Sequence, residues 1–441
     1  MENEGFSGVV RISNISDFIA PNLNCIIPLE TTKTEVKSES LVGIRKKTDT
    51  EGKPKEKKTI KISLNDCLAC NGCITTAETV LVEEQSLTKV LETVKDFQLC
   101  IATVCPQTVS SIAVKRQLEP SQVAMMISAY FFNLGFKYVL DSSFGRLFAH
   151  KALREEFSKS TTRPMLSSAC PGFVCYAEKT HGNLLTPLIS KVRSPQAIQG
   201  ALVKDFLSRK LKVAPENIYH VTVMPCFDKK LEASRADFNV PGTSCRETDC
   251  VLSTAELENA LPAEFDPVTT TDEGWLGAFP SGHLVSSYGG TSGGYSELII
   301  DSFANKCTGP IKETLVMKNL RVFEIPVEEK KIQVAQCYGF RNIQNVVRKL
   351  KTGKCPYDFI EVMACPSGCG NGGGQIRAET AEERELLLRK VEGAYSSIKD
   401  DFDFNYENTI AEWSELNPNY EQLLYTDYHI IDANITQKLE W

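Results

Sequence analysis

Four cysteines in the second part of this 441-residue chain occupy similar positions in their segments. Cys170, Cys226, Cys365 and Cys369 each lie at or just after the end of a short apolar run typical of a buried strand, next to a proline or a glycine. Ligands in open α/β sheets bind beyond the carboxyl ends of strands, so cysteines far apart in the sequence can meet at one point. Four thiolates at one buried point suit an iron–sulfur cluster.

A second group of cysteines lies nearer the N-terminus, where Cys67, Cys70 and Cys73 are separated by two residues each. This spacing wraps three thiolates around one corner of a [4Fe–4S] cube and leaves the fourth ligand to come from elsewhere. Structural zinc more often uses two separated cysteine pairs, so the run favours a cluster over zinc. Cys105-Pro106 mimics the proline that follows the last cysteine of a bacterial ferredoxin set, but no second run accompanies it. The residues alone leave three candidates for the fourth ligand, namely Cys25, Cys100 and Cys105.

The elements that must position these cysteines change in character along the chain. Residues 30–59 are rich in Lys, Glu, Thr and Ser and are typical of an exposed, mobile tether, whereas residues 79–114 predict short strands and turns. From residue 121 helices alternate with strands, which predicts parallel, doubly wound sheets. The helical candidates are residues 121–134, 146–159, 195–211, 293–306, 341–351 and 380–398. The strand candidates are residues 137–141, 164–168, 218–224, 315–325, 332–336 and 358–364.

We therefore expect an α/β protein in which a small N-terminal iron–sulfur cluster domain is followed by two doubly wound lobes. The predicted N-terminal domain is residues 1–115, and the predicted two-lobed domain with the buried cluster site is residues 116–400. Residues 401–441 are acidic and aromatic, and we expect them to pack over the outside as short helices and coil.

Composition and charge exclude several functional classes. The chain is 42% hydrophobic and 24% charged, and its net charge of −7 argues against a broad nucleic-acid footprint. The acidic N-terminus lacks the apolar core of a signal peptide, and the longest apolar stretch, residues 123–136, is too short and too interrupted to span a bilayer. Sixteen cysteines without a secretory signal indicate a reducing compartment and metal or redox roles. We expect neither nucleic acid nor membrane as a partner.

Three segments, residues 167–174, 223–232 and 361–374, resemble the signature motifs of iron-only hydrogenases, in order and nearly residue for residue. The resemblance extends over roughly residues 60–400 and implies two hydrogenase-like lobes that clasp a [4Fe–4S] cluster. It also implies Cys25 as the fourth ligand of the N-terminal cluster, which gives two [4Fe–4S] clusters in all. The ligands that it implies for the second cluster are Cys170, Cys226, Cys365 and Cys369.

Other residues fit the same pattern. Lys229 and Glu232 belong to the second motif, where the lysine of the family approaches the diatomic ligands of the catalytic iron pair. The alternative for Lys229 is an exposed lysine at the start of a helix. The glycine-rich residues 289–294 resemble another loop that lines the pocket, and residues 194–196 open a helix as in the family.

One position departs from the hydrogenase pattern. Working hydrogenases carry two adjacent cysteines in the first motif, one that binds the cluster and one that relays protons to a two-iron subsite. Ala169 occupies the relay position here, and alanine has no ionisable proton. Cys175 lies about one helical turn beyond Ala169, and nothing in the sequence brings its sulfur to the relay position. We therefore expect a fold that houses clusters, without hydrogenase activity.

The third motif also has a competing interpretation. Gly368, Gly370 and Gly373 match the G-x-G-x-x-G spacing of a dinucleotide-binding loop after a predicted strand. The same stretch contains Cys369 at its centre and follows Cys365 closely. Small residues also let a backbone close around a cluster and point N–H groups at its sulfurs. The cluster interpretation is therefore the one we adopt.

The chain ends in Leu439, Glu440 and Trp441. A terminal tryptophan beside a leucine is useful as an anchor in a partner, and the alternative is that it packs on its own domain. The tripeptide resembles the aliphatic–acidic–aromatic tail by which clients and adaptors bind the cytosolic iron–sulfur targeting complex. A WD40-propeller subunit of that complex is the partner that the resemblance implies.

The absent relay cysteine, the reduced N-terminal cluster domain and the tail together identify one branch of the superfamily. The chain resembles the eukaryotic iron-only-hydrogenase-like proteins of the cytosolic iron–sulfur assembly (CIA) machinery, also described as nuclear prelamin A recognition factor-like. That resemblance implies an adaptor or cluster carrier, in the cytoplasm and also in the nucleus, which links the early scaffold to the targeting complex. One rival is an iron-only hydrogenase or another electron-transferring oxidoreductase, against which Ala169 counts. The other is a zinc-stabilised interaction module, which iron and sulfide content would distinguish.

Overall fold

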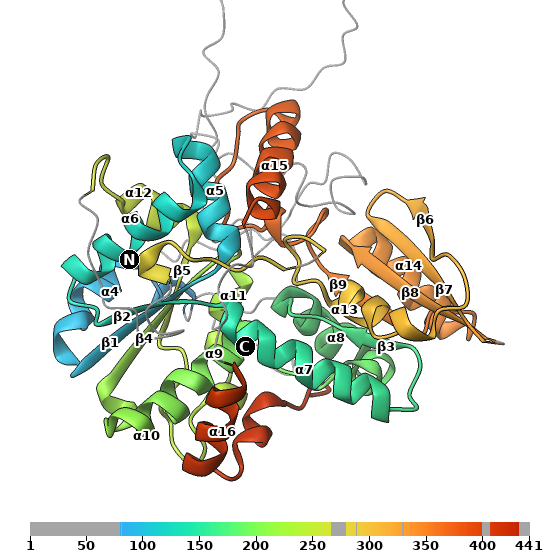
Figure 1. Cartoon of the computed structure of the whole chain (residues 1–441), viewed down its shortest axis with the longest axis horizontal. Helices are drawn as coiled ribbons and strands as arrows, with labels where there is room; N and C mark the ends of the chain where they lie inside the picture. Colours follow the sequence, from blue (N-terminus) through green and yellow to red (C-terminus); the bar gives the residue numbers. More distant parts are fainter. Residues whose placement is uncertain are drawn as a thin grey trace, which may run out of the picture.

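Two β-sheets organise the protein, one on each side of Figure 1. The computed structural model describes residue 80 and residues 82–265, 279–287, 289–328, 330–398 and 406–431. The first sheet has the strand order β2-β1-β4-β5, and the second has the order β3-β9-β8-β7-β6. The strands are β1 (Leu99–Val104), β2 (Tyr138–Asp141), β3 (Met165–Ser167), β4 (Ile218–Met224), β5 (Cys250–Ser253), β6 (Lys312–Met317), β7 (Leu320–Val327), β8 (Lys330–Tyr338) and β9 (Phe359–Met363).

Every pairing in the first sheet is parallel, as the sequence predicted. All residues of β1 and β4 are buried, as expected for strands whose two faces are both covered. Alternate side chains of β1 enter different cores: Ile101 joins the core that contains Phe206, and Ala102 joins the core that contains Ile127. This sheet is therefore doubly wound, with helices on both faces.

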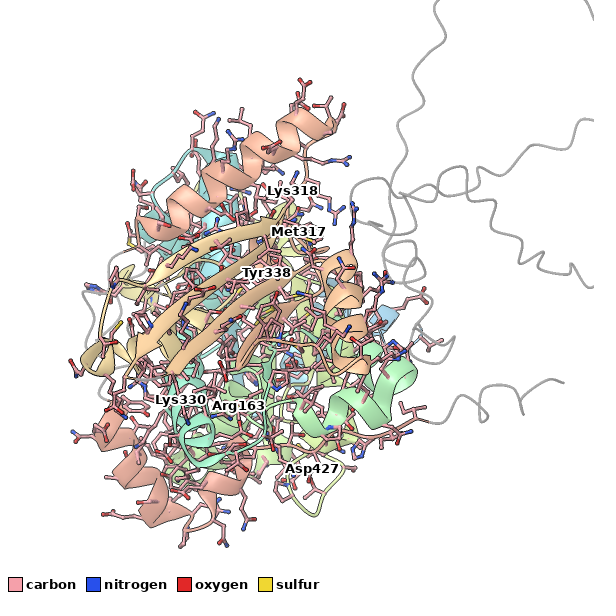
Figure 2. The ribbon with its side chains drawn as sticks, turned by 90° about the vertical axis from the view of Figure 1, so that its right-hand side faces the viewer. Arg163, Met317, Lys318, Lys330, Tyr338 and Asp427 are labelled. Atoms are coloured by element: carbon pink, nitrogen blue, oxygen red, sulfur yellow. The ribbon has the colours of Figure 1, made fainter. Side chains whose placement is uncertain are left out.

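The second sheet is mixed. β3, β9 and β8 pair in parallel, whereas β6, β7 and β8 form an antiparallel meander. The prediction of one strand over residues 315–325 was wrong, because the chain reverses between Met317 and Leu320 (Figure 2). Asn319 has a φ of 67°, a left-handed conformation that asparagine tolerates better than most residues, so the turn forms without glycine.

Helices surround both sheets. Five of the six predicted helices are found within a few residues of their predicted ends, although one of them is interrupted by a π-helical stretch at Leu202–Leu207. The sixth, predicted over residues 293–306, is shorter. The α-helices are α4 (Leu87–Thr93), α5 (Pro106–Arg116), α6 (Pro120–Asn133), α7 (Ser143–Lys159), α8 (Pro171–Leu185), α9 (Pro195–Ala201), α10 (Ser208–Leu211), α11 (Asp228–Ala233), α12 (Thr254–Ala260), α13 (Tyr295–Asp301), α14 (Phe340–Lys351), α15 (Ala381–Ser396) and α16 (Tyr406–Leu416).

The prediction for residues 79–114 was wrong, because this part contains helices α4 and α5 as well as strand β1. β1 pairs with β2 on one side and β4 on the other, so it lies inside the first sheet. It also precedes residue 116, where the two-lobed domain was predicted to begin. The predicted domain limits stay a prediction, and the segments before residue 80 lie outside the described residues.

The described part of the C-terminal segment forms short helices and coil on the outside of the core that contains Phe206, as predicted. Helix α16 is fixed by Trp413, which is fully buried and donates from Nε1 to Asp205 Oδ2 at 2.8 Å. The 3-10 helix Tyr420–Leu424 follows it and buries Leu423 and Leu424. Over the described ranges, no helix is both long and apolar enough to cross a membrane.

Candidate iron–sulfur crevice

The four cysteines of the hydrogenase-like motifs come from three strand ends. Cys170 caps the start of helix α8 just after β3, and Cys226 follows β4 before α11. Cys365 and Cys369 follow β9 of the second sheet. The structure brings the four thiols together, because a negative charge on Cys170, Cys365 or Cys369 would raise the pKa of the Cys226 thiol. The place where the four cysteines meet, between strand ends of the two sheets, is called the cysteine crevice below.

The loop that carries Cys369 is held by a loop far away in the sequence. Ser292 Oγ accepts from the backbone N–H of Cys369 at 3.3 Å, and Thr291 Oγ1 accepts from that of Gly370 at 3.1 Å. Gly368 has a φ of +82°, and a Cβ added there would lie 1.9 Å from Ser292 Oγ. Glycine is therefore required at residue 368 by both conformation and space. Thr291 and Ser292 of the glycine-rich residues 289–294 thus support the loop, and a role of these residues in lining the pocket stays a prediction.

The following glycines pack directly on the Cys226 segment. Gly374 donates its N–H to Pro225 O at 3.0 Å, and a Cβ on Gly374 would lie 3.3 Å from Cys226 Cα. A Cβ on Gly372 would lie 2.2 Å from Pro225 O. These contacts join the third motif to the second. They also occupy backbone groups that a nucleotide phosphate would need, and the next helix, α15, begins only at Ala381, so the dinucleotide interpretation is disfavoured.

Burial controls the protonation of these thiols. It raises the pKa of Cys369 to about 12, with the charge of Cys170 as the next cause, and it raises the pKa of Cys226 well above its ordinary value. The pKa of Cys170 is also raised, by burial and by Asp228. Free thiols here are therefore protonated at neutral pH. Cationic iron is what would hold four thiolates at this point, and its binding would release their protons.

The donor set fits a [4Fe–4S] cluster better than one metal ion. Four thiolates on one zinc would lie about 4 Å apart, because Zn–S bonds are about 2.3 Å long. Among the described residues, no group of three or more His, Cys, Asp or Glu side chains is arranged to hold one metal ion. A cubic cluster instead gives each cysteine its own iron, and such a cluster supplies electron storage when it is bound.

Lys229 is buried and paired. Its side chain is 9% exposed, and its Nζ lies 3.0 and 2.9 Å from the two carboxylate oxygens of Glu232. Ser194 Oγ donates to Glu232 Oε1 at 2.5 Å, and Gln196 Nε2 donates to the same oxygen at 3.2 Å. The alternative of an exposed lysine was therefore wrong. The lysine charge is neutralised inside the protein by a carboxylate with two further donors.

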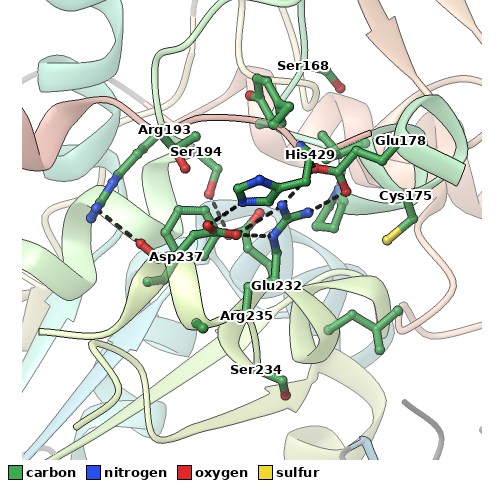
Figure 3. A pocket seen from close by; sticks show the side chains of 18 of the residues that line it. Ser168, Cys175, Glu178, Arg193, Ser194, Glu232, Ser234, Arg235, Asp237 and His429 are labelled. Carbon is green, nitrogen blue, oxygen red and sulfur yellow. Dashed lines mark hydrogen bonds and ion pairs between the residues drawn. The ribbon is translucent and has the colours of Figure 1, made fainter. Parts of the chain in front are cut away.

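A cavity of about 300 Å³ adjoins the crevice (Figure 3). Ala169 lines it, directly before Cys170, and Cys175 lines it from the next turn of α8. Its lining also includes Arg235 and Asp237, together with Thr426, Tyr428, His429 and Ile431 of the C-terminal segment. Ala169 therefore presents a methyl group to this cavity, and the Cys175 thiol lies in its lining.

Cys105, one of the candidate ligands of the N-terminal cluster, lies in the core, where it is 3% exposed and its Sγ lies 3.2 Å from Thr108 Oγ1. It directly follows strand β1, which is next to β4, and a charge on its thiol would raise the pKa of Cys369. Cys105 is thus a fifth thiol near the crevice. The signal that could have found it is the cysteine–proline pair after an apolar run, which Cys105 shares with Cys170 and Cys365.

Several predicted residues lie outside the described ranges. They are the N-terminal cluster ligands Cys25, Cys67, Cys70 and Cys73 and the tail residues Leu439, Glu440 and Trp441. Their roles stay predictions. Of the two other candidates for the N-terminal cluster, Cys100 is 4% exposed and donates to Val94 O at 3.3 Å, as expected for a small core residue.

Comparisons with known proteins agree on the family. Residues 98–373 match the family described as iron only hydrogenase large subunit, C-terminal domain. A Caenorhabditis elegans protein named "Probable cytosolic Fe-S cluster assembly factor" is 52% identical over 100% of both chains. The Rattus norvegicus protein named cytosolic iron-sulfur assembly component 3 is 38% identical over 99% of each chain. A variant of an FeFe-hydrogenase from Chlamydomonas reinhardtii superposes with a TM-score of 0.62 and 25% identity, covering 78% of this chain and 98% of that one. The chain belongs to the family of cytosolic Fe–S cluster assembly factors that carry the iron-only-hydrogenase large-subunit domain.

Proposed function

We propose that the protein is an adaptor and cluster carrier of cytosolic iron–sulfur protein assembly, which links the early scaffold to the targeting complex. The observation that carries the proposal is the cysteine crevice, where one buried and three half-buried cysteines from three strand ends meet. The names of the relatives support the pathway, since two of them are called cytosolic assembly factors or components. The cytosol is the proposed compartment, and the nuclear pool stays a prediction.

The proposed cofactors are two [4Fe–4S] clusters. Cys170, Cys226, Cys365 and Cys369 would hold one of them in the crevice, and the cysteine run near the N-terminus with Cys25 would hold the other. The test is an anaerobic count of iron and acid-labile sulfide with EPR of the reduced protein. We expect about eight irons and eight sulfides per chain, because each cube contributes four of each. Iron for one cluster only would contradict the proposal, and zinc without sulfide would favour the interaction module.

We further propose that the protein does not turn over hydrogen. Ala169 offers no proton to the cavity, and general acid–base relay contributes on the order of a hundred- to ten-thousand-fold to rate. The buried Lys229–Glu232 pair also supports this proposal, because the lysine is already committed to a carboxylate. We expect no hydrogen evolution or uptake and no infrared bands from iron-bound carbon monoxide or cyanide. Either signal would favour the hydrogenase instead.

Partner binding is assigned to the tail. Trp441 and Leu439 would supply apolar contacts to a WD40-propeller subunit of the targeting complex, and Glu440 with the terminal carboxylate would favour a basic pocket there. The test is a pull-down of the purified targeting complex by wild type and by a variant that lacks residues 439–441. Equal recovery of the complex would show that the tail is not the recognition element.

A further inference from the structure

The C-terminal segment has two parts that meet at Tyr425, and the two parts are attached to the rest of the protein in different ways. Before this residue, Leu424 is 8% exposed and its carbonyl accepts from Arg193 N at 2.9 Å. Arg193 Nε also donates to Tyr425 O at 2.9 Å. Residues 426–431, which we call the C-terminal strap, follow it, and Thr426, Tyr428, His429 and Ile431 of the strap line the cavity beside Ala169.

The strap is attached to both walls of the cavity by hydrogen bonds. On the α8 wall, the backbone N–H of His429 donates to the carboxylate of Glu178 at 2.9 Å. The backbone N–H of Ile431 donates to the backbone carbonyl of Glu178 at 3.2 Å. On the opposite wall, His429 Nε2 lies 2.7 Å from Asp237 Oδ1 (Figure 3). Tyr428 donates its hydroxyl to Ser190 O at 3.1 Å. Cys170 is the N-cap of α8, so the strap contacts the helix that begins directly after a proposed cluster ligand.

The walls do not depend on the strap. Arg235 pairs with both carboxylate oxygens of Glu178, at 2.9 and 2.8 Å, and with Asp237 at 3.1 Å. If the strap is removed, both carboxylates still have Arg235 as a partner. Leaving a buried carboxylate without a cation would be the most costly consequence, and it is avoided here. The side chain of His429 is 58% exposed, and Ile430 and Ile431 are 51% and 38% exposed. Release of the strap thus exposes little additional surface at these three side chains, and Tyr428, which packs against the core, is the main apolar contact that is lost.

We propose that the C-terminal strap closes the cavity beside Cys170 and that a protein bound to the last three residues of the chain opens it. This inference rests on the proposed role of the tail. Ten residues separate Ile431 from the chain end, so the bound partner must stand within about 35 Å of the strap. A partner at that distance can extend its contact onto the exposed Ile430 and Ile431. It then binds the open strap better than the closed one, which is the condition for shifting the equilibrium.

One glycine allows a direct test of closure. A Cβ on Gly182 of α8 would lie 2.9 Å from Ile430 Cγ2 and 3.2 Å from Ile430 Cα. Gly182→Ala should therefore displace the strap while favouring the helix itself. His429→Ala removes the bond to Asp237 and serves as a second opening variant. Asp427→Asn is the matched control, because the Asp427–Lys191 pair is exposed on both sides and contributes little.

The readout is alkylation of Cys175, which lines the cavity without being a proposed ligand. Cluster-loaded full-length protein is treated anaerobically with iodoacetamide, and labelling is followed by peptide mass spectrometry with iron content and melting temperature in parallel. We expect Gly182→Ala and His429→Ala to react roughly three- to tenfold faster than wild type, in proportion to the open population. Asp427→Asn should react like wild type. Equal rates in all four proteins would overturn closure by the strap.

The coupling is tested by adding the purified targeting complex. We expect it to accelerate Cys175 labelling in wild type and to leave the variant without residues 439–441 unchanged. Binding without acceleration, or acceleration that survives removal of the tail, would overturn the coupling alone. Failure of the complex to bind wild type would overturn the proposed tail function and the coupling together, while the Gly182→Ala comparison would still decide whether the strap closes the cavity.

Discussion

The cysteine crevice is built from more separate parts of the chain than the C-terminal segment contacts. Its thiols stand at the ends of three strands, and the loops that carry them are bonded to one another and to the Thr291–Ser292 turn. The C-terminal segment is anchored by Trp413 and Leu424. Beyond them it lies on the surface, where its hydrogen bonds go to Glu178 and Asp237, two carboxylates that already pair with Arg235. The first arrangement suits retention of a cluster, and the second suits a response to a partner. Substitutions in the two regions should therefore have separable effects.

The largest expected effect is that of Cys365→Ala. It should remove the crevice cluster, roughly half of the bound iron, and also lower the melting temperature, because that cluster would join loops from both sheets. Cys67→Ala should lose a similar share of iron and leave the fold intact, since a loop ligand carries little core packing. Metal analysis and circular dichroism measure both properties.

Cys355→Ala is the control for that comparison, because Cys355 is a half-buried thiol that follows α14 away from the crevice. It should keep the wild-type iron content. If Cys365→Ala also kept all its iron, the crevice would not be a cluster site. If Cys365→Ala lost iron and also lost binding to the targeting complex, the separation between the crevice and the tail would fail.

Next in size is Glu232→Gln, which tests the wall of the crevice. The change leaves Lys229 charged and 9% exposed without its carboxylate, and breaking a buried pair in this way costs about 3–5 kcal/mol of the free energy of unfolding. The matched surface change is Glu385→Gln, whose partner Arg389 is 73% exposed, and it should cost at most about 0.5 kcal/mol. Denaturant unfolding of both variants measures the difference. Equal costs would mean that the Lys229 pair is open to solvent.

Removal of residues 439–441 tests the other region. Binding of the targeting complex should weaken roughly ten- to a thousand-fold, because a buried interface aromatic contributes a few kcal/mol. Iron content should stay unchanged, since the tail lies outside the cluster motifs. Titration with the purified complex and iron analysis together give the result. A lower iron content in this variant would show that the tail supports the crevice. The effects of substitutions in the two regions would then not be separable.

The sequence predicted the crevice better than the segment that covers its cavity. Apolar runs that end in cysteine with proline or glycine signal strand ends, and parallel strand ends share one edge of a sheet. The helices were also predictable where caps are explicit, as at Thr380 with Glu383 or Ser194 with Pro195. Helix α12 was missed although Ser253 and Glu256 form a readable capping box.

Other features had no comparable signal. The strap and the walls of its cavity are held by pairs of residues far apart in the sequence, such as His429 with Asp237 and Arg235 with Glu178, and no local pattern predicts such contacts. The β6–β7 turn at Asn319 lacks the glycine that usually indicates a hairpin. The place of Cys105 near the crevice was not predicted, because only the pairing of the neighbouring strands shows that it lies beside β4.

The smallest expected effect concerns pH and acts on the strand that leads to Cys226. His220 lies in β4, fully buried, with Nδ1 2.9 Å from Glu247 O and Nε2 2.9 Å from Thr103 Oγ1. Burial lowers its pKa to about 3. Between that value and the unfolded value near 6.5, the unfolded chain binds a proton that the folded chain does not, so stability falls as the pH falls.

From pH 7.5 to 5.5 this histidine should remove about 1.4 kcal/mol from the free energy of unfolding, a loss that His220→Gln should abolish. Thr103→Val breaks the same hydrogen bond but leaves the imidazole in place, so it should keep the pH dependence of wild type. Denaturant unfolding at the two pH values gives the difference for each protein. An unchanged pH dependence in His220→Gln would show that His220 takes up a proton in the folded protein. The β4 side of the crevice would then accept a proton at a higher pH than the burial of His220 implies.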